Sequence, residues 1–278
     1  MTDEPILSVL IPAYAYKQGV LRILDALPLG SPEIEVIVHD DSPDAEIEAE
    51  MATERFRHVT YRHNVPSLGA VANWNRLIEA AHGRYIVLIH HDEYPADPDF
   101  AERVLRALKD EPAPDIFLFG LRLRRKGVPH AFRLVPEALR RWLISDAPGY
   151  LLKRNFIGPS ACLLMRRSIA PRFDPNLVWL VDVDFYLQAL ERARIVKQSK
   201  AIDIVSETVR AESITRSLSP DLGEIASRER RGLVDKHLSA VGLKRLDRLG
   251  LFEPPFWYFF RLIGLLPSLR NRTTGQAR

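Results

Sequence analysis

The first 120 residues alternate between short apolar runs and segments in which apolar residues recur at helical spacing. The apolar runs have the length and composition of buried strands, and they cover residues 7–11, 33–38, 59–61 and 84–89. The helical patterns cover residues 18–27, 68–82 and 99–109, with Gly83 in the position of a helix-ending glycine. This alternation predicts βαβ units and therefore an α/β fold, a mostly parallel sheet flanked by helices.

The second half of the chain is less regular. Residues 116–119 and 161–165 have strand-like patterns, and residues 182–192 have a helical one. The tail has a mostly helical pattern, with a break at Pro254 and Pro255. The length of 278 residues allows one large domain or two small ones.

Composition excludes several classes of protein. Hydrophobic residues make up 46% of the chain and charged residues 27%, which is typical of a globular protein and not of a disordered or fibrous chain. The single cysteine, Cys162, cannot form an internal disulfide, so we expect a reducing, cytoplasmic compartment. No signal-peptide pattern opens the chain, and no apolar stretch reaches the ~18–20 residues that span a bilayer.

The net charge of +3 is unevenly distributed. Residues 224–278 carry 11 Lys and Arg against 5 Asp and Glu, whereas residues 1–223 carry 28 against 31. The basic character therefore belongs to the tail. A slightly acidic body argues against a nucleic-acid groove, so we expect no nucleic-acid partner.

Three groups of polar residues are candidates for chemistry. Residues 39–44 follow the second strand, and they form either a polar turn with a helix cap or acceptors for a base and a ribose. Residues 90–93 follow the fourth strand, as a solvated loop or as a cation site built on Asp92 and one neighbour. Asp182 and Asp184 begin a helix, where they either cap it or supply a general base. The first two groups lie at the carboxyl ends of strands, where parallel sheets bind ligands.

These groups, in this order and spacing, resemble family 2 glycosyltransferases with the GT-A fold. The resemblance covers roughly residues 6–216, although no single motif is specific alone. It is carried by residues 8–14, 36–42, Asn64, 68–70, Asn73, 83–86, 91–92, 155–160 and 182–185. It implies an inverting enzyme that moves a sugar from a nucleoside-diphosphate sugar to an acceptor hydroxyl.

The resemblance also implies roles for individual residues. Asp41 or Asp40 would read the base, commonly uracil or thymine, which favours a UDP- or dTDP-sugar. The nucleotide pocket as a whole would comprise Pro12, Ala13, Tyr14, Asp40, Asp41, Asn64, Gly69, Asn73 and His91.

Metal, base and acceptor roles are implied in the same way. Asp92 resembles the last acidic residue of the family's Asp-x-Asp motif, which would hold Mn²⁺ or Mg²⁺ against the diphosphate. Asp182 resembles the catalytic base, with Asp184 as its rival. The sugar and acceptor would contact Gly158, Pro159, Ser160 and Trp179.

Three departures from the family pattern bear on these roles. His91 stands where an acidic residue is common, so we expect weaker or more Mn²⁺-biased metal binding. Glu212 replaces a histidine that is common two residues after an arginine, here Arg210. The Gln-x-x-Arg-Trp signature of processive synthases is missing around Arg141 and Trp142, which disfavours a polymer synthase.

We therefore expect a GT-A catalytic domain over residues 1–220 and a basic helical extension over residues 221–278. Within the domain, the nucleotide part covers about 1–120 and the acceptor part about 121–220. The expected acceptor is a glycan or a lipid-linked glycan, as in bacterial polysaccharide or glycolipid assembly. The alternative is a catalytically silent sugar-nucleotide-binding or scaffold protein of the same fold. A nucleotidyltransferase is disfavoured because no Gly-rich phosphate loop follows the first strand.

The extension contains an aromatic and aliphatic run near residues 256–266, with Arg261, Arg270 and Arg272 in or beyond it. Such a segment can lie in a membrane interface with its basic residues on anionic headgroups. It can equally pack on the catalytic core or on a homodimer partner. We therefore expect residues 253–272 to contact the inner membrane face or protein.

Overall fold

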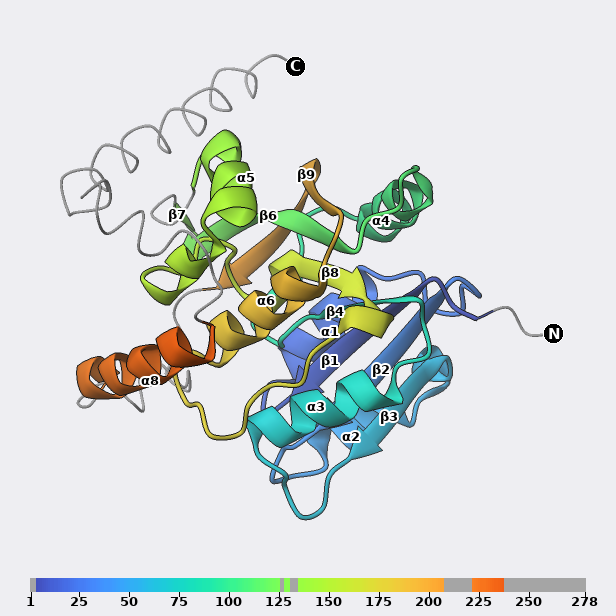
Figure 1. Cartoon of the computed structure of the whole chain (residues 1–278). Helices are drawn as coiled ribbons and strands as arrows, with labels where there is room; N and C mark the ends of the chain where they lie inside the picture. Colours follow the sequence, from blue (N-terminus) through green and yellow to red (C-terminus); the bar gives the residue numbers. More distant parts are fainter. Residues whose placement is uncertain (1–3, 126–127, 131–134, 208–221, 238–278) are drawn as a thin grey trace.

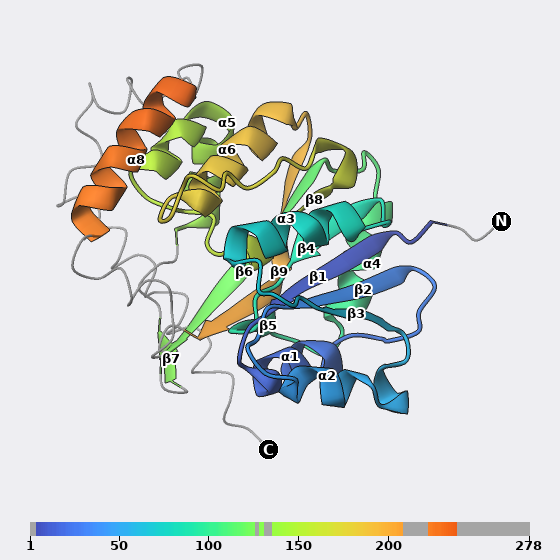
Figure 2. The ribbon, with the colours of Figure 1, turned by 90° about the horizontal axis from the view of Figure 1, so that it is seen from below.

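The computed structural model describes residues 4–125, 128–130, 135–207 and 222–237 (Figure 1). Within these residues one sheet has the strand order β3-β2-β1-β4-β8-β6-β9-β5, and β7 pairs with β6. This arrangement confirms the predicted α/β fold. Helices cover both faces of the sheet, with α1 and α2 on one side and α3 and α6 on the other (Figure 2).

The N-terminal half of the sheet is parallel. It consists of β1 (Leu7–Ala13), β2 (Ile34–Asp40), β3 (Val59–His63) and β4 (Tyr85–Leu88). Strand β1 pairs with both β2 and β4, and β2 pairs with β3, all in parallel. Every residue of β1 is buried, so its continuous apolar sequence reflects cover on both faces.

The second half of the sheet is mixed. Strand β8 is antiparallel to both β4 and β6, whereas β6 is parallel to β9. Strands β5 and β7 pair in antiparallel fashion with β9 and β6. The bounds are β5 Glu93–Pro95, β6 Ile116–Arg125, β7 Val128–His130, β8 Leu163–Arg166 and β9 Val196–Glu207.

The helices predicted from apolar spacing are present, with shifts of a few residues at their ends. The α-helices are α1 Lys17–Asp25, α2 Glu46–Met51, α3 Ala70–Ala80, α4 Phe100–Lys109, α5 Glu137–Asp146, α6 Val181–Arg192 and α8 Leu222–Lys236. Short 3₁₀ helices are η1 Glu54–Phe56, η2 Pro148–Leu152, η3 Ser160–Cys162 and η4 Arg167–Ile169.

Gly83 does not end α3, so that prediction is wrong. The helix ends at Ala80, and Ala81 is already extended. Gly83 instead packs against β1, where its N–H donates to Ser8 Oγ at 2.8 Å. A Cβ on Gly83 would lie 2.6 Å from the Ser8 backbone nitrogen, so the glycine is required by this close approach.

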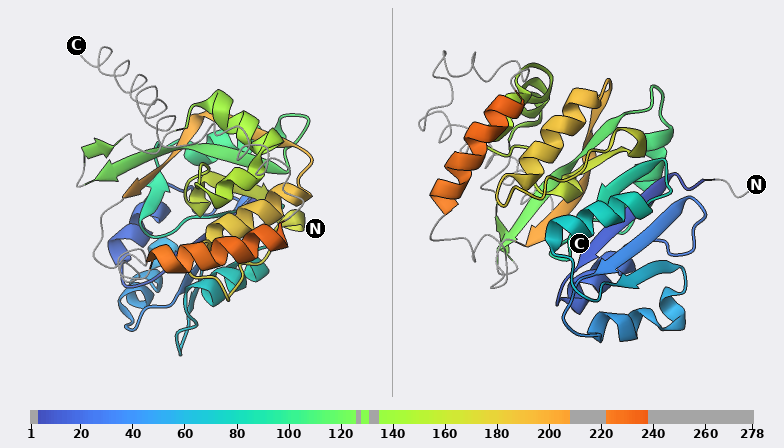
Figure 3. Two further views of the ribbon diagram at one scale, coloured as in Figure 1. Left: turned by 60° about the vertical axis from the view of Figure 1, so that its left-hand side comes forward. Right: turned by 60° about the horizontal axis from the view of Figure 1, so that its bottom comes forward.

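Helix α8 is the described part of the predicted C-terminal extension. It lies alongside α6, as both views in Figure 3 show, and it also contacts η2. The segment 253–272, for which a membrane or protein contact was predicted, lies outside the described residues. Within the described ranges, no helix has both the length and the apolar character to cross a bilayer.

Candidate active site

The carboxyl ends of β1 and β2 lie side by side and bring the first predicted residues together. Parallel register pairs Pro12 with His39 and Ala13 with Asp40. The Asp41 N–H donates to the Ala13 carbonyl at 3.0 Å. Pro12 and Ala13 are buried in the sheet, whereas Tyr14, the next residue, is 52% exposed. Tyr14 is therefore open to a ligand.

Asp41 organises the loop that leads into α3. Its Oδ1 accepts from Asn64 Nδ2 at 3.1 Å and from the Leu68 N–H at 2.9 Å. Its Oδ2 accepts from Ser67 Oγ and from the Gly69 N–H, both at 2.8 Å. Four donors satisfy a carboxylate, so Asp41 would have to release one of them to read a base. Its role in base recognition stays a prediction.

Asp40 is fully buried and holds the neighbouring loops. Its carboxylate accepts from the Ser42 N–H, the Ser42 hydroxyl and Tyr61 Oη. Ser42 Oγ in turn accepts the Ala15 N–H at 2.8 Å. Ala15 has a φ of 46°, in the left-handed region, which is unusual for alanine and marks a backbone held by its surroundings. The turn after β1 is thus tied to the turn after β2.

Asn64 and Asn73 complete this first cluster. Asn64 Nδ2 donates to Asn73 Oδ1 at 3.0 Å, and Asn73 Nδ2 donates to the His39 carbonyl at 3.1 Å. Both side chains are buried, so they fix α3 to the end of β2. Gly69 is exposed and has a φ of 81°, and a Cβ added to it would meet no atom within 4 Å. The space beside Gly69 is accessible to a nucleotide.

A second cluster forms beyond β4 around His90. Its Nδ1 lies 3.1 Å from Ser160 Oγ and 3.5 Å from Glu93 Oε2. The Trp74 ring packs edge-on against the imidazole, with centroids 5.0 Å apart. Burial acts to lower the pKa of His90, but the buried Glu93 carboxylate outweighs it and raises that pKa to about 9. Because Trp74 follows Asn73, α3 connects the two clusters.

Asp182 lies in the first turn of α6 and faces this second cluster. Among the described residues, its Oδ1 is buried without a hydrogen-bond partner, although the residue as a whole is partly exposed. Burial raises the pKa of Asp182, and the nearby His90 acts in the opposite direction. His90 Nε2 is also buried with no hydrogen-bond partner in the described part of the chain. Two such polar atoms indicate a place where a polar ligand binds.

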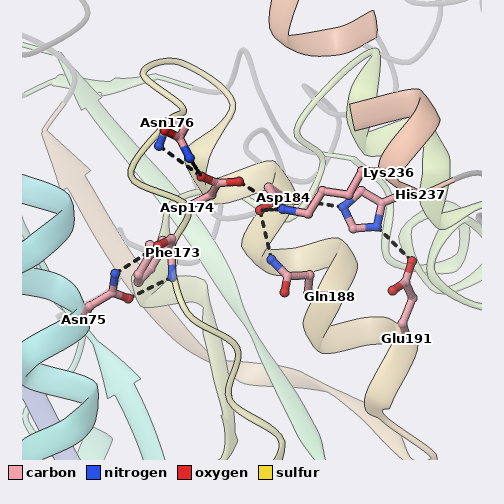
Figure 4. A network of polar contacts seen from close by, with 9 residues as sticks. All are labelled: Asn75, Phe173, Asp174, Asn176, Asp184, Gln188, Glu191, Lys236 and His237. Carbon is pink, nitrogen blue, oxygen red and sulfur yellow. Dashed lines mark hydrogen bonds and ion pairs between the residues drawn. The ribbon is translucent and has the colours of Figure 1, made fainter. Parts of the chain in front are cut away.

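Asp184, the other candidate for the base, forms its hydrogen bonds with α8 and with its own helix rather than with the second cluster. Its Oδ2 accepts from Lys236 Nζ and from Gln188 Nε2, both at 2.9 Å, and its Oδ1 lies 2.7 Å from His237 Nε2 (Figure 4). These contacts with Lys236 and His237 lower its pKa against the opposing effect of burial. Both oxygens serve to attach the C-terminal end of α8 to α6. The geometry therefore favours Asp182 as the residue that faces a substrate.

The Gly158–Ser160 loop reaches the second cluster through Ser160. The Gly158 backbone has a φ of 109°, which favours glycine. Its carbonyl accepts from Asn155 Nδ2 at 2.7 Å and from Tyr186 Oη at 3.0 Å. Pro159 and Trp179 are partly buried. The loop is thus rigidly held where the sequence predicted a sugar contact.

The His91 backbone is fixed by α1. The His91 carbonyl would lie 1.9 Å from a Cβ on Gly19, so only glycine allows α1 to pack this closely. The imidazole packs edge-on against Tyr16, with centroids 5.9 Å apart. Asp92 follows with a partly exposed side chain, and its carbonyl accepts the Glu207 N–H at 3.1 Å.

The donor set fits a divalent cation shared with a diphosphate. The described residues contain no group of three or more His, Cys, Asp or Glu side chains that could hold a metal by themselves. A partly exposed carboxylate such as Asp92 suits Mg²⁺ or Mn²⁺, which can bind through one carboxylate with phosphate oxygens and water as the other ligands.

Sequence reasoning missed the central position of His90 and the contribution of Trp74. His90 comes directly after a strand-like apolar run, and this position at a strand end is a signal for a site residue. The adjacent His91 and Asp92 fit the family's Asp-x-Asp motif better than His90 does. Trp74 carried no signal, because one aromatic residue on an amphipathic helix normally packs in the core.

Comparison with known proteins decides the family. Residues 8–172, more than half of the chain, match the model of glycosyl transferase family 2. The chain belongs to glycosyl transferase family 2. It is therefore a glycosyltransferase that takes its sugar from a nucleotide sugar.

Relatives by sequence include several mycobacterial proteins. An uncharacterized protein of Mycobacterium tuberculosis, MT1568, is 25% identical over 224 residues, which cover 76% of this chain and 70% of that protein. Other mycobacterial relatives are 28% identical over 189 residues, and the chain spans about half of their length, 52%.

Solved structures share the fold of this glycosyltransferase. Mannosyltransferase PcManGT from Pyrobaculum calidifontis, in complex with GDP-Man and Mn²⁺, has a TM-score of 0.56 at 13% identity, covering 98% of this chain and 88% of its own. S. aureus TarS 1–349, in complex with UDP-GlcNAc, has a TM-score of 0.56 at 17% identity, covering 75% and 60%. At these identities the likeness shows a GT-A fold.

Proposed function

We propose that this glycosyltransferase inverts the anomeric centre, with Asp182 as the general base. The observation that carries the proposal is the buried Asp182 Oδ1, which has no hydrogen-bond partner among the described residues and lies beside His90. An acceptor hydroxyl has a pKa far above 7, so it needs a carboxylate within hydrogen-bond reach as it attacks. The burial that raises the pKa of Asp182 makes its ionised form a stronger proton acceptor.

The proposed step is a single displacement. The acceptor oxygen attacks the anomeric carbon from the face opposite the diphosphate, and its proton passes to Asp182. The bond between the anomeric carbon and the phosphate oxygen breaks, and the nucleoside diphosphate leaves with the electron pair. Asp92 is the residue that would hold Mn²⁺ or Mg²⁺, which would stabilise the charge on the leaving diphosphate.

For the donor we propose a UDP- or dTDP-sugar. Its nucleotide would lie over the first cluster, beside the exposed Tyr14 and Gly69. The UDP-GlcNAc complex of TarS supports a uracil nucleotide, whereas the GDP-Man complex of PcManGT shows that the fold also accepts guanine. We propose a glycan or lipid-linked acceptor, as in polysaccharide or glycolipid assembly. A thermal-shift screen of nucleoside diphosphates with and without Mn²⁺ tests the choice of donor, because a ligand that binds the folded state raises Tm.

The assignment of the base is tested with two variants of the same helix. Asp182→Asn should cut turnover by roughly 10²–10⁴-fold, the scale of a general base, while donor binding stays within about twofold. Its Tm should be unchanged or slightly raised, because the substitution removes a buried charge. Asp184→Asn is the matched control, and it should lower Tm because it weakens the ion pair with Lys236. Near-wild-type turnover in Asp182→Asn, with turnover lost in Asp184→Asn, would assign the base to Asp184.

A further inference from the structure

Helix α8 contacts the segment that leads into α6 through one buried side chain, Glu229. Its Oε1 accepts the Val178 N–H at 2.7 Å, and its Oε2 accepts the N–H groups of Trp179 and Leu180 at 3.1 and 2.8 Å. The side chain belongs to a residue that is only 7% exposed. Three successive backbone donors thus converge on a single carboxylate from another helix.

This contact lies immediately before the helix that carries Asp182. Leu180 directly precedes the first residue of α6, and Asp182 is the second residue of that helix. The N-cap residue of α6 is Leu180, and no side-chain hydrogen bond caps the helix there. The three hydrogen bonds to Glu229 tie the backbone immediately before this turn to α8.

We propose that Glu229 is a positioning residue for Asp182. This inference rests on the proposed function, in which Asp182 is the base. Within the described residues, the hydrogen bonds that Glu229 accepts come from the backbone of residues 178–180, so it would act on Asp182 through that backbone. The carboxylate of Asp182 must lie within hydrogen-bond reach of the acceptor hydroxyl, and a shift of about 1 Å in such a group can cost about 10²-fold in rate. Residues beyond the matched family segment 8–172 would then form part of the working active site.

The positioning role proposed for Glu229 can be separated from a role in which α8 only anchors itself to α6. The helix has a second attachment two turns further on, where Lys236 and His237 bond to the Asp184 side chain (Figure 4). Lys236 also lies 3.2 Å from Asp174. Removing that attachment loosens α8 from α6 but leaves the three donors on Glu229. The two attachments can therefore be weakened one at a time.

Glu229→Gln is the sharpest substitution because it keeps size and shape. Glutamine offers one acceptor oxygen, and its amide would point hydrogens at a backbone N–H, so at least one of the three donors loses its partner. We expect kcat to fall about 10- to 100-fold and the donor KM to change by less than about twofold. Lys236→Met is the matched control on the same helix, and it should lower Tm while leaving kcat within about twofold.

The test combines steady-state kinetics, Tm and amide hydrogen exchange of residues 178–184 in the full chain. Faster exchange and a lower kcat in Glu229→Gln, with neither in Lys236→Met, supports the inference. Partial recovery of kcat in Glu229→Asp, which keeps the carboxylate one methylene shorter, supports it further, and this variant carries the test if the glutamine variant does not fold.

Three results would overturn the inference. The first is wild-type kcat in Glu229→Gln despite faster exchange, which leaves the proposed function intact. The second is an equal loss of kcat in Lys236→Met, which would mean that Glu229 only attaches α8 to the rest of the chain. The third is a wild-type protein that transfers sugar from no nucleotide sugar, which refutes the proposed function itself. This result can be distinguished from a failure of the Glu229 inference alone, because the hydrogen-exchange measurement needs no substrate.

Discussion

Asp41 offers a direct test of what the first cluster does. The residue is 4% exposed, and its carboxylate accepts four hydrogen bonds from the segment between β3 and α3. Asp41→Asn keeps the shape but replaces one acceptor oxygen with an amide that can only donate. The amide would then face two donors, whichever way the side chain is turned. The substitution therefore disturbs the loop even when no nucleotide is bound.

The size of the effect follows from those contacts. Hydrogen bonds to charged groups contribute about 1.5–3 kcal/mol each, and the asparagine loses two of them. Ser67 is exposed and its hydroxyl can rotate to accept, so we expect a loss in the free energy of unfolding near the lower end, about 3 kcal/mol. For a domain of this size, 1 kcal/mol shifts Tm by roughly 2–4 °C, so Tm should fall by roughly 6–12 °C.

Thermal unfolding of the ligand-free protein, followed by circular dichroism, measures this shift. Asp44→Asn is the matched control, because Asp44 lies exposed in the same turn and, within the described part of the chain, accepts a hydrogen bond from the Glu46 N–H alone. It should change Tm by less than about 2 °C, as surface substitutions usually change stability little. If Asp41→Asn also leaves the ligand-free Tm unchanged but abolishes nucleotide binding, the reasoning is refuted and Asp41 reads the base.

Two further predictions concern the cation and α8. Asp92→Ala should raise the Mn²⁺ concentration for half-maximal turnover at least about tenfold, and an unchanged metal titration would place the cation elsewhere. Burial acts to lower the pKa of His237, but the carboxylates of Asp184 and Glu191 outweigh burial and raise that pKa above its usual 6.5. The contribution of His237 to stability is therefore full below pH 6.5 and is lost as pH rises through the raised pKa. The lowered pKa of Asp184 gives a contribution that is present above pH 3.8 and lost as pH falls through the lowered value. The Tm difference between wild type and His237→Gln should therefore be largest between about pH 4 and pH 6.5 and shrink toward pH 9. A Tm difference that grows from about pH 6.5 to pH 9 would contradict the ion pairs of His237 with Asp184 and Glu191.

Most of the N-terminal fold could be predicted because its signals are local. Buried parallel strands have continuous apolar sequences, and the helices between them have an apolar face, so β1, β2, β3 and β4 were each found within two residues at either end. The prediction for Gly83 failed for a non-local reason. A glycine that ends a helix and a glycine that lets two backbones approach look the same in sequence, and only the packing against Ser8 tells them apart.

The candidate site was only partly predictable. The rule that ligands bind beyond the carboxyl ends of parallel strands located the segments that hold Asp41 and Asp92. It could not show that His90 lies against Ser160, because these residues are 70 positions apart and come from different strands and loops. Nor could it show that the carboxylate of Asp41 is already occupied by the loop at Leu68 and Gly69.

The choice between Asp182 and Asp184 shows what each level decides. The amino-acid order alone established the succession of strands and helices, the family resemblance and the presence of two carboxylates at the start of a helix. Residues two positions apart point about 200° apart around a helix, so only one of them can face the sheet edge. Which one does so depends on how α6 is rotated. In the folded chain Asp184 bonds to Lys236 and His237 at the C-terminal end of α8, whereas Asp182 faces His90. That contact exists only in the folded chain, because its partners lie more than 50 residues apart in the sequence.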